Sequence, residues 1–299
     1  MLIYIKLILT ALFWAGTFIA GRTLGRENGV VSPFSAAFLR FVVAAAPLVF
    51  LTWRKEKRLQ PLRYSDIVVV LLLALTGVFL YHFLFLKGLQ KVQPSRASII
   101  IATSPVFITF FSAVFFKEKL TVLKFAGIAL SVFGAVFVIT EGKLSMIFNK
   151  GFGKGELCIA GCLICWVIYS LLGKAYIEKL SGLVIVCYSV VLGMIMLFIP
   201  AAFGGLFREI STYTLTKDWT SILYLGIFGT VVGYVWYYDG LEQVGPVRTA
   251  QFINLIPIFT VLLSSLILKE RITISLLAGT VLVLSGVYLT NKRPNYKRA

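Results

Sequence analysis

Two distant stretches of the chain resemble each other: "KVQPSRASIIIATSPVFITFFSAVFFKEKLT", from Lys91 to Thr121, and "QVGPVRTAQFINLIPIFTVLLSSLILKERIT", from Gln243 to Thr273. Gln243 follows Lys91 by 152 residues, and the same offset pairs residues along the rest of the chain without a net gap. The paired identities outside the two stretches are Trp14 with Trp166, Gly21 with Gly173, Asp66 with Asp218, Gly77 with Gly229, Gly88 with Gly240, Gly127 with Gly279 and Gly134 with Gly286. The chain therefore contains two copies of one unit.

Apolar residues dominate the composition. The 299-residue chain is 59% hydrophobic and 14% charged, whereas a soluble domain carries roughly 25% charged residues. The apolar residues form runs of about 20, the length that crosses a bilayer as a helix. We predict an all-α membrane protein with ten transmembrane helices, at 2–22, 33–53, 66–86, 95–115, 121–140, 155–173, 183–204, 218–238, 247–268 and 273–291.

Each copy of the unit contains five of these predicted helices. A five-helix unit that begins on one side of the membrane ends on the other, so its copy inserts upside down. We predict two inverted five-helix repeats, at 1–145 and 153–292, followed by a basic cytoplasmic tail at 293–299. Because the first helix has a counterpart deep in the chain, we expect it to be retained rather than cleaved as a signal peptide.

The net charge of +17 would suggest a nucleic-acid partner in a soluble protein. Here the basic residues flank apolar runs, where they set the orientation of membrane helices. We therefore expect no nucleic-acid partner. A modest excess of Lys and Arg on one side favours a multi-pass protein of the cell (plasma) membrane with both termini in the cytoplasm.

Cysteines offer one candidate metal or redox site. Cys158, Cys162 and Cys165 share a helix face, but no histidine lies near them in sequence to complete a zinc site. We favour packing of small buried thiols, and we expect neither a metal nor a cofactor.

Three features together resemble a known family. They are the two quoted stretches, each preceded by Gly-Leu a few residues earlier, the segment "ALFWAGTF" at 11–18 and "FLRF" at 38–41. The chain resembles the drug/metabolite transporter (DMT) superfamily, of the EamA type, over essentially its whole length. The resemblance implies a ten-helix carrier of 5+5 inverted repeats that exports amino acids or other small metabolites, and it says little about the substrate.

Two prolines, Pro105 and Pro257, lie inside predicted helices at equivalent positions of the repeat. Each removes a backbone N–H and frees the carbonyl one turn earlier, near Ile101 and Ile253, so we expect helix kinks there. In a bilayer the freed group must be satisfied by protein or by cavity water. The kinks either shape a cavity or serve as static packing features.

Ionisable side chains within the membrane are expensive and mark candidate sites. Arg40 lies about seven residues, or roughly 10 Å, into the second predicted helix. Its guanidinium suits a carboxylate or a phosphate on a substrate; the alternative is that it snorkels to the interface. His82, the only histidine, is either a packing residue or a proton carrier near neutral pH.

The remaining candidate substrate contacts are polar or aromatic. Gln251 and Asn254 precede the Pro257 kink, and their repeat partners Ile99 and Ala102 are apolar. Their polarity serves either a site or bonding between helices. The aromatic candidates are Trp14, Phe85, Trp166, Tyr169, Tyr234 and Tyr237. If these rings converge they wall a small-ligand pocket, although aromatic residues also gather at membrane interfaces.

We therefore predict a secondary transporter that exports small amphipathic metabolites, amino acids or related organic compounds, by alternating access around a midplane cavity. A flippase or carrier for a lipid-linked substrate on the same scaffold is the alternative. A primary pump is disfavoured because the chain has no P-loop motif. An enzyme is disfavoured because one histidine and no securely buried carboxylate offer little catalytic machinery. The expected partners are the lipid bilayer and the small-molecule substrate, with a homodimer as a further option.

Overall fold

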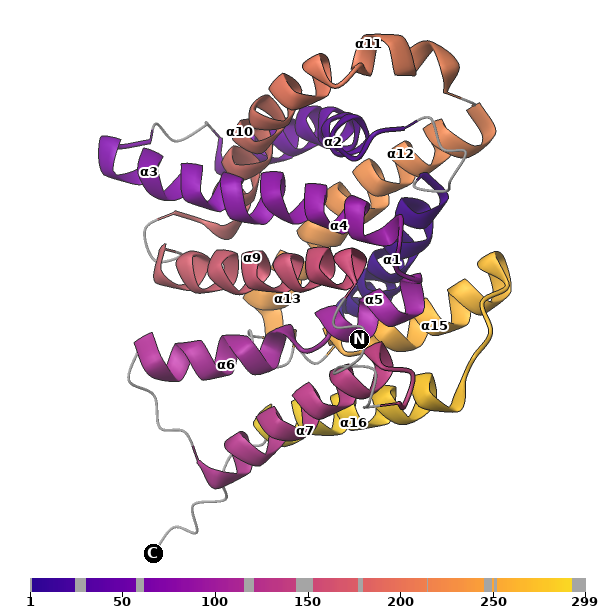
Figure 1. Ribbon diagram of the computed structural model, residues 1–299. Helices are drawn as coiled ribbons and strands as arrows, with labels where there is room; N and C mark the ends of the chain where they lie inside the picture. Colours follow the sequence, from indigo (N-terminus) through magenta and orange to yellow (C-terminus); the bar gives the residue numbers. More distant parts are fainter. Residues whose placement is uncertain are drawn as a thin grey trace, which may run out of the picture.

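The computed structural model describes residues 2–24, 31–57, 62–115, 121–143, 153–176, 180–213, 215–244, 249 and 252–291. Every regular element within these residues is a helix (Figure 1). Eight helices in this part of the chain are long and apolar enough to cross a membrane, and two shorter apolar helices lie at Leu255–Leu268 and Ile274–Thr290. The prediction of an all-helical protein is confirmed within the described residues, and the eight long apolar helices support a multi-pass membrane protein. The count of ten spans stays a prediction.

Helices of the first half follow the predicted spans closely. They are α1 (Leu2–Leu24), α2 (Pro33–Glu56), α3 (Tyr64–Leu73), the π-helix η1 (Ala74–Leu80), α4 (Tyr81–Leu89), α5 (Pro94–Ile101), α6 (Ser104–Phe115) and α7 (Val122–Ile139). Local sequence explains their starts. At α2 the Ser32 hydroxyl accepts a hydrogen bond from the Ser35 N–H, and Pro33 occupies the first turn, where its missing N–H costs nothing.

Helices of the second half repeat the first at the predicted offset. They are α9 (Lys154–Tyr176), α10 (Gly182–Phe203), α11 (Leu206–Glu209), η2 (Ile210–Thr212), η3 (Leu215–Trp219), α12 (Thr220–Gly226), η4 (Ile227–Val232), α13 (Gly233–Val244), α15 (Leu255–Leu268) and α16 (Ile274–Asn291). Helix α9 begins and ends 152 residues after α1, and α16 begins and ends 152 residues after α7. For these two pairs of helices, the pairing read from the sequence is also a pairing of helix boundaries.

The repeat-related helices α7 and α16 pack against each other at one edge of the molecule (Figure 1). A Cβ atom added at Gly127 would lie 2.7 Å from the carbonyl oxygen of Gly286, and one added at Gly134 would lie 3.0 Å from that of Gly279. Gly127, near the start of α7, meets Gly286 in the later part of α16, whereas Gly134 meets the earlier Gly279. The two helices are therefore antiparallel. Glycine permits this close backbone approach.

Other contacts between the halves surround the centre of the molecule. Helix α2 packs on α10, α4 packs on α9, and α1 packs on α13 and α15. The largest buried apolar cluster joins these layers, and its fully buried members include Phe41, Leu48, Leu89, Ile159 and Ile222. The second half thus interlocks with the first rather than following it as a separate body.

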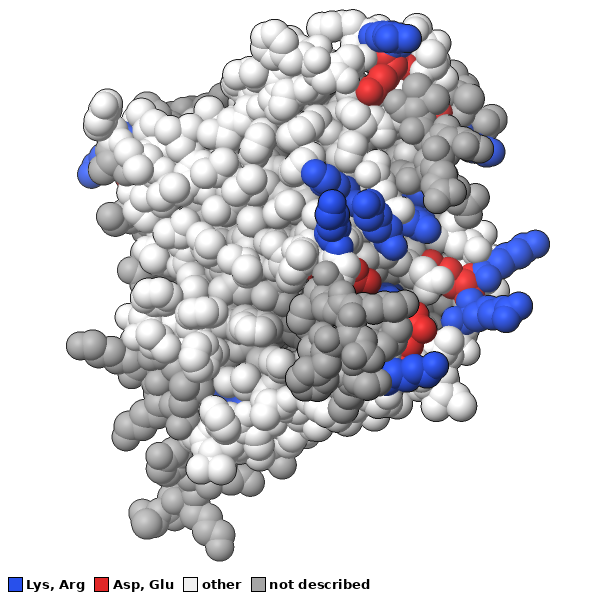
Figure 2. All heavy atoms as spheres, viewed as in Figure 1, with Lys and Arg blue, Asp and Glu red and all other residues white. Residues whose placement is uncertain are grey.

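Charged side chains are sparse on the face shown in Figure 2. They gather towards one side of that view, over the ends of α4, α11 and α15, and the remaining described surface there is almost free of charge. Large apolar side chains such as Phe50, Phe125, Phe203 and Leu266 are exposed. An apolar surface with charges at helix ends suits a protein whose flanks face lipid.

Candidate functional site

A cavity of about 380 Å³ lies between the two halves of the chain. Its walls come from α1, α2, α4, α5 and α6 on one side and from α9, η4, α13 and the segment leading into α15 on the other. The rings that border it are Trp14, Phe18, Tyr81, Phe85, Trp166, Tyr234 and Tyr237. The cavity therefore has the aromatic walls and the size of a small-ligand pocket.

Among the described residues that line the cavity, Arg40 is the only Lys or Arg. It is 4% exposed, and its Nε–H donates to Thr230 Oγ1 over 3.0 Å. The Thr230 hydroxyl in turn donates to the Leu225 carbonyl over 2.9 Å, five residues earlier in the same helix. The guanidinium carbon lies 5.5 Å from the centre of the Phe41 ring. A hydroxyl held by the π-helix η4 thus orients the guanidinium.

The outer part of the Arg40 guanidinium is left for another partner. The described ion pairs and hydrogen bonds give Arg40 Thr230 as its one bonded partner, and no Asp or Glu is among the described residues that line the cavity. Nη1 and Nη2 carry four of the five N–H donors of the fork. A buried cation whose donors are largely unused is costly unless something pairs with it.

Trp14 joins the two halves at the cavity wall. Its indole N–H donates to the Gly229 carbonyl over 3.1 Å. Its ring lies 5.3 Å from the ring centre of Tyr237 and 5.9 Å from that of Tyr234. The three rings come from α1 and α13, so they form one aromatic corner of the cavity.

His82 occupies the wall near Arg40 on α4. Its Nδ1 lies 3.0 Å from the Val78 carbonyl one turn earlier, and because a carbonyl only accepts, that nitrogen carries a proton. The ring meets Phe41 and Tyr81 edge-on, at 4.7 Å and 4.9 Å between centres. His82 is 2% exposed. It is packed and bonded to backbone while still bordering the cavity.

The chain breaks its fourth predicted helix one turn before Pro105. Helix α5 ends at Ile101 and α6 begins at Ser104. The Ser104 hydroxyl donates to the Ile101 carbonyl, and the Thr103 hydroxyl donates to the Ile100 carbonyl over 2.7 Å. The Ser104 hydroxyl thus bonds the Ile101 carbonyl, which Pro105 leaves without its usual N–H donor. At the equivalent place in the second half, a turn at Asn254 precedes α15 and its Pro257.

Two π-helical segments at equivalent positions line or support the cavity. η1 ends at Leu80 and η4 at Val232, a difference of 152 residues. Sequence reasoning missed both segments. Their one visible signal was the paired glycines Gly77 and Gly229 inside them. π-helical turns are frequent at functional sites, and Gly229 lies on the cavity wall.

The sequence-predicted site residues divide into three groups. The cavity brings together Trp14, Arg40, His82, Phe85, Pro105, Trp166, Tyr234 and Tyr237. Tyr169 instead fills the space above Gly77 and stacks on Trp166 with 5.5 Å between ring centres, and Asn254 and Pro257 lie beside the cavity rather than among its lining residues. Gln251 lies outside the described residues.

Several lining residues were not singled out in the sequence analysis. Tyr81, Ser98, Ser104 and Ser170 border the cavity, and Thr230 orients Arg40. Ser104 alone could have been anticipated, because a hydroxyl directly before an internal proline is well placed to satisfy a freed carbonyl.

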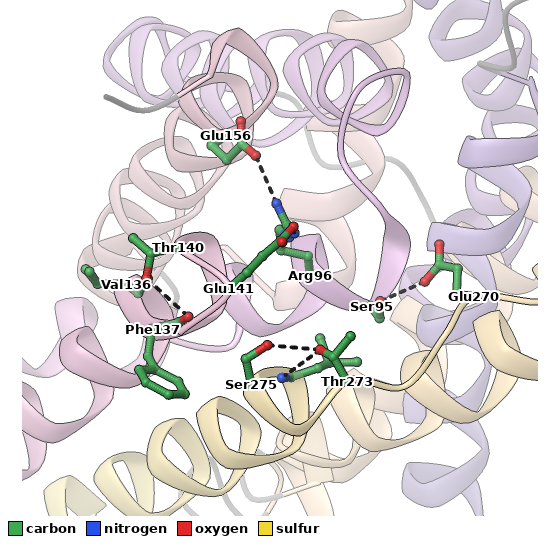
Figure 3. A network of polar contacts seen from close by, with 11 residues as sticks. Ser95, Arg96, Val136, Phe137, Thr140, Glu141, Glu156, Glu270, Thr273 and Ser275 are labelled. Carbon is green, nitrogen blue, oxygen red and sulfur yellow. Dashed lines mark hydrogen bonds and ion pairs between the residues drawn. The ribbon is translucent and has the colours of Figure 1, made fainter. Parts of the chain in front are cut away.

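A polar network joins the halves at one end of the molecule (Figure 3). Arg96 at the start of α5 pairs with Glu141, which follows α7, and its Nη1 lies 3.6 Å from Glu156 Oε1 in the first turn of α9. The Ser95 hydroxyl donates to Glu270 over 2.7 Å. Three helix ends and the α15–α16 connector are thereby tied together at this end.

The cysteine face of α9 carries packing contacts. The Cys162 thiol donates to the Tyr81 carbonyl over 3.4 Å, and the four cysteines are free. No group of three or more His, Cys, Asp or Glu residues with metal-binding geometry is found in the described part of the chain.

Comparison with known proteins gives a consistent picture. The sequence matches the EamA-like transporter family twice, at residues 1–140 and 153–292. An uncharacterized transporter of Archaeoglobus fulgidus is 32% identical, covering 97% of each chain. The uncharacterized transporter YyaM of Bacillus subtilis is 29% identical over 95% of this chain and 92% of that protein.

Two further proteins are similar to this chain, one with a named activity and one with a solved structure. A protein of Streptantibioticus cattleyicolor named a probable terminal-alkyne amino-acid exporter is 25% identical over 96% of this chain and 92% of its own. A crystal structure that is 20% identical superposes with a TM-score of 0.66 and covers 96% of each chain. At that identity the superposition speaks for the fold alone.

Proposed function

Because the chain belongs to the EamA-like transporter family, we propose that it is a secondary transporter that exports small amphipathic metabolites, amino acids or related organic compounds. The observation that carries the proposal is the cavity between the halves, with aromatic walls and a single oriented guanidinium. Rings would hold the apolar part of a cargo, and Arg40 would hold its acid group. The probable amino-acid exporter among the relatives supports the same class of cargo.

Alternating access between two inverted five-helix repeats is the mechanism that we propose. Antiparallel packing of the repeat-related helices α7 and α16 supports the inversion. Further support comes from paired contacts across the halves. A Cβ added at Gly88 would meet Ile159 at 2.6 Å, and one added at Gly240 would meet Leu7, the repeat partner of Ile159, at the same distance. Equivalent contacts at equivalent places are what a twofold relation between inverted repeats produces.

The Arg96 network would act as the closure at one end of the cavity. Arg96 belongs to the first repeat and Glu156 to the second, and Ser95 and Glu270 are divided in the same way. Rocking of one repeat against the other therefore has to separate these pairs. The partly buried ion pair of Arg96 with Glu156 and the hydrogen bond of Ser95 to Glu270 are each worth no more than about 3 kcal/mol, so they can bias the closed end without locking it.

Orientation follows the distribution of basic residues. We propose that both termini lie in the cytoplasm of a plasma-membrane protein, because Lys and Arg are in slight excess on that side. The Arg96 network would then lie on the external side. The energy source is either a proton gradient or exchange against another metabolite, and the cavity lining offers His82 as its one histidine for a proton-coupled step.

Counterflow in proteoliposomes tests the proposal. Vesicles are loaded with a pooled metabolite mixture that includes amino acids, and mass spectrometry records which compounds exchange, with and without a pH gradient. Exchange of a few carboxylates or amino acids is the expected result. Absence of any exchange in both conditions, with protein shown to be folded in the vesicles, contradicts export of soluble amphipathic metabolites and directs attention to lipid-linked cargo.

A further inference from the structure

We infer that the preferred cargo is a monoanion, an apolar or aromatic monocarboxylate that carries no amino group, rather than a zwitterionic amino acid. The inference rests on the proposed transport function and narrows its substrate class. It depends on the charge balance of the cavity, on the asymmetry of the repeat around Arg40, and on the position of the aromatic corner.

The charge balance of the described cavity lining is one positive charge and no negative one. Arg40 supplies the positive charge, and the described acidic residues are engaged elsewhere. Asp239 pairs with Lys6 at 2.8 Å, Glu270 accepts from Ser95, and the remaining described acids lie at helix ends: Glu56, Asp66, Glu141, Glu156, Glu209 and Asp218. A bound monocarboxylate neutralises the cavity, whereas a bound zwitterion leaves an ammonium group without an acidic partner.

An ammonium group would lose its water without a matching gain. Ring faces of Trp14, Tyr234 and Tyr237 attract cations, but this attraction is small beside the cost of dehydrating a charge that has no counter-ion. Hydroxyls at Ser98 and Ser170 line the cavity and are neutral. The site therefore discriminates against the amino group while accepting the carboxylate that Arg40 is shaped to bind in a bidentate manner.

The repeat itself argues that the Arg40 arrangement serves a ligand. Arg40 and Thr230 form a hydrogen-bonded pair between the halves, and their repeat partners are Leu192 and Val78, which are both apolar. The scaffold thus packs at the equivalent place without any polar pair. Burial of a cation and its orienting hydroxyl at one of the two equivalent places is a stability cost that packing does not require.

The region next to Arg40 also differs from its equivalent place in the repeat. A Cβ at Gly229 would lie 2.6 Å from Thr17 and 3.4 Å from Arg40 Nη2. At the equivalent place in the other half, the partner of Thr17 is Tyr169, whose ring fills the space above Gly77. A small threonine in place of a tyrosine leaves the region around the guanidinium open to the cavity, where the carboxylate of a cargo would lie.

A matched set of four ligands tests the charge preference. 3-Phenylpropanoate, phenylalanine, 3-phenylpropanamide and 2-phenylethylamine share one ring and linker, and they differ in being anionic, zwitterionic, neutral and cationic. Binding to the purified full chain in detergent is followed by tryptophan fluorescence, since Trp14 and Trp166 border the cavity. We expect 3-phenylpropanoate to bind at least about tenfold more tightly than each of the other three compounds. The amide and the amine lack the carboxylate that makes a charge-assisted hydrogen bond to Arg40, and phenylalanine keeps the carboxylate but carries an ammonium group without an acidic partner.

Three variants assign the preference to Arg40. Arg40→Gln should weaken 3-phenylpropanoate binding by about 10- to 100-fold, and Arg40→Lys should restore part of it because the charge returns without the fork. Arg208→Gln is the matched control, because Arg208 is exposed on α11 and outside the cavity. It should bind all four ligands as the wild type does. Melting temperatures of the variants establish that each is folded.

The outcomes separate this inference from the transport proposal. Binding and exchange of phenylalanine at least as strong as those of 3-phenylpropanoate overturn the inference and leave the transporter proposal in place. Unchanged binding by Arg40→Gln overturns it as well. If none of the four ligands binds, the inference fails, and the pooled counterflow experiment decides separately whether the transport proposal fails with it.

Discussion

Close contact between α7 and α16 predicts a strong penalty for one added methyl group. In Gly127→Ala the new Cβ would lie 2.7 Å from the Gly286 carbonyl oxygen and 2.7 Å from the Thr290 backbone nitrogen. Ordinary contact begins at 3.4 Å, so the two backbones have to separate by about 0.7 Å. Overpacking of this kind typically costs about 1–3 kcal/mol.

Gly173→Ala is the matched control for this prediction. Gly173 lies in the helix α9, and a Cβ added there meets nothing within 4 Å. Both substitutions gain the same backbone term, about 1 kcal/mol in favour of alanine within a helix. Their difference in unfolding free energy therefore isolates the cost of pushing α7 and α16 apart, and it should be about 1–3 kcal/mol.

Equilibrium unfolding in mixed micelles of detergent and dodecyl sulfate measures both variants. A double variant, Gly127→Ala with Gly286→Ala, should lose less than the sum of the single changes, because the first substitution already separates the helices. If Gly127→Ala is as stable as Gly173→Ala, the two backbones are not in close contact, and the support that their antiparallel packing gives to inverted repeats is lost.

Three further predictions concern the site, the closed end and the pH dependence of stability. Thr230→Val, which installs the residue of the other repeat, should lower the melting temperature because the buried Arg40 Nε–H loses its partner, and it should weaken carboxylate binding about tenfold by releasing Arg40; unchanged affinity would contradict an orienting role. Arg96→Gln should raise the rate at which a maleimide added outside labels Ser98→Cys in a background without native cysteines, and an unaltered rate would exclude the closure. Burial raises the pKa of Tyr213, so the folded state keeps this proton to higher pH than the unfolded state. The contribution of Tyr213 to the unfolding free energy is fully present below pH about 10 and is lost as the pH rises above it. In Tyr213→Phe, the part of the alkaline decrease in unfolding free energy that Tyr213 causes should be absent.

Much of the fold was predictable because repetition and hydrophobicity are properties of long segments. An offset of 152 residues placed the boundaries of α9 and α16 relative to α1 and α7, and apolar runs of about 20 residues located the spans. Proline chemistry located the interruption before Pro105. Such signals average over many residues or follow from one strong local rule, so tertiary contacts seldom reverse them.

The π-helices and the finer site were less accessible. A π-turn differs from an α-turn over a few residues, and the run "ALTGVFL" at 74–80 contains no pattern that separates the two. The partner of Arg40, Thr230, is 190 residues away, and nothing local in the sequence connects them. Tyr169 was expected in the cavity, but the slot left by Gly77 holds its ring instead. Side-chain placement of this kind depends on packing between helices.

Pseudo-symmetry and its interruption have different physical roles in this chain. Equivalent glycine contacts, such as Gly88 with Ile159 and Gly240 with Leu7, are apolar, and under the proposed alternating access they would permit two similar arrangements of the halves at similar free energy. A cargo, however, is a single molecule without twofold symmetry, so the groups that bind it gain nothing from being duplicated. If Arg40 binds the cargo as proposed, a polar pair such as Arg40 with Thr230 is needed at only one of the two equivalent places between the halves: a second buried cation would add the cost of its burial and leave the cavity charged after a monoanion had bound.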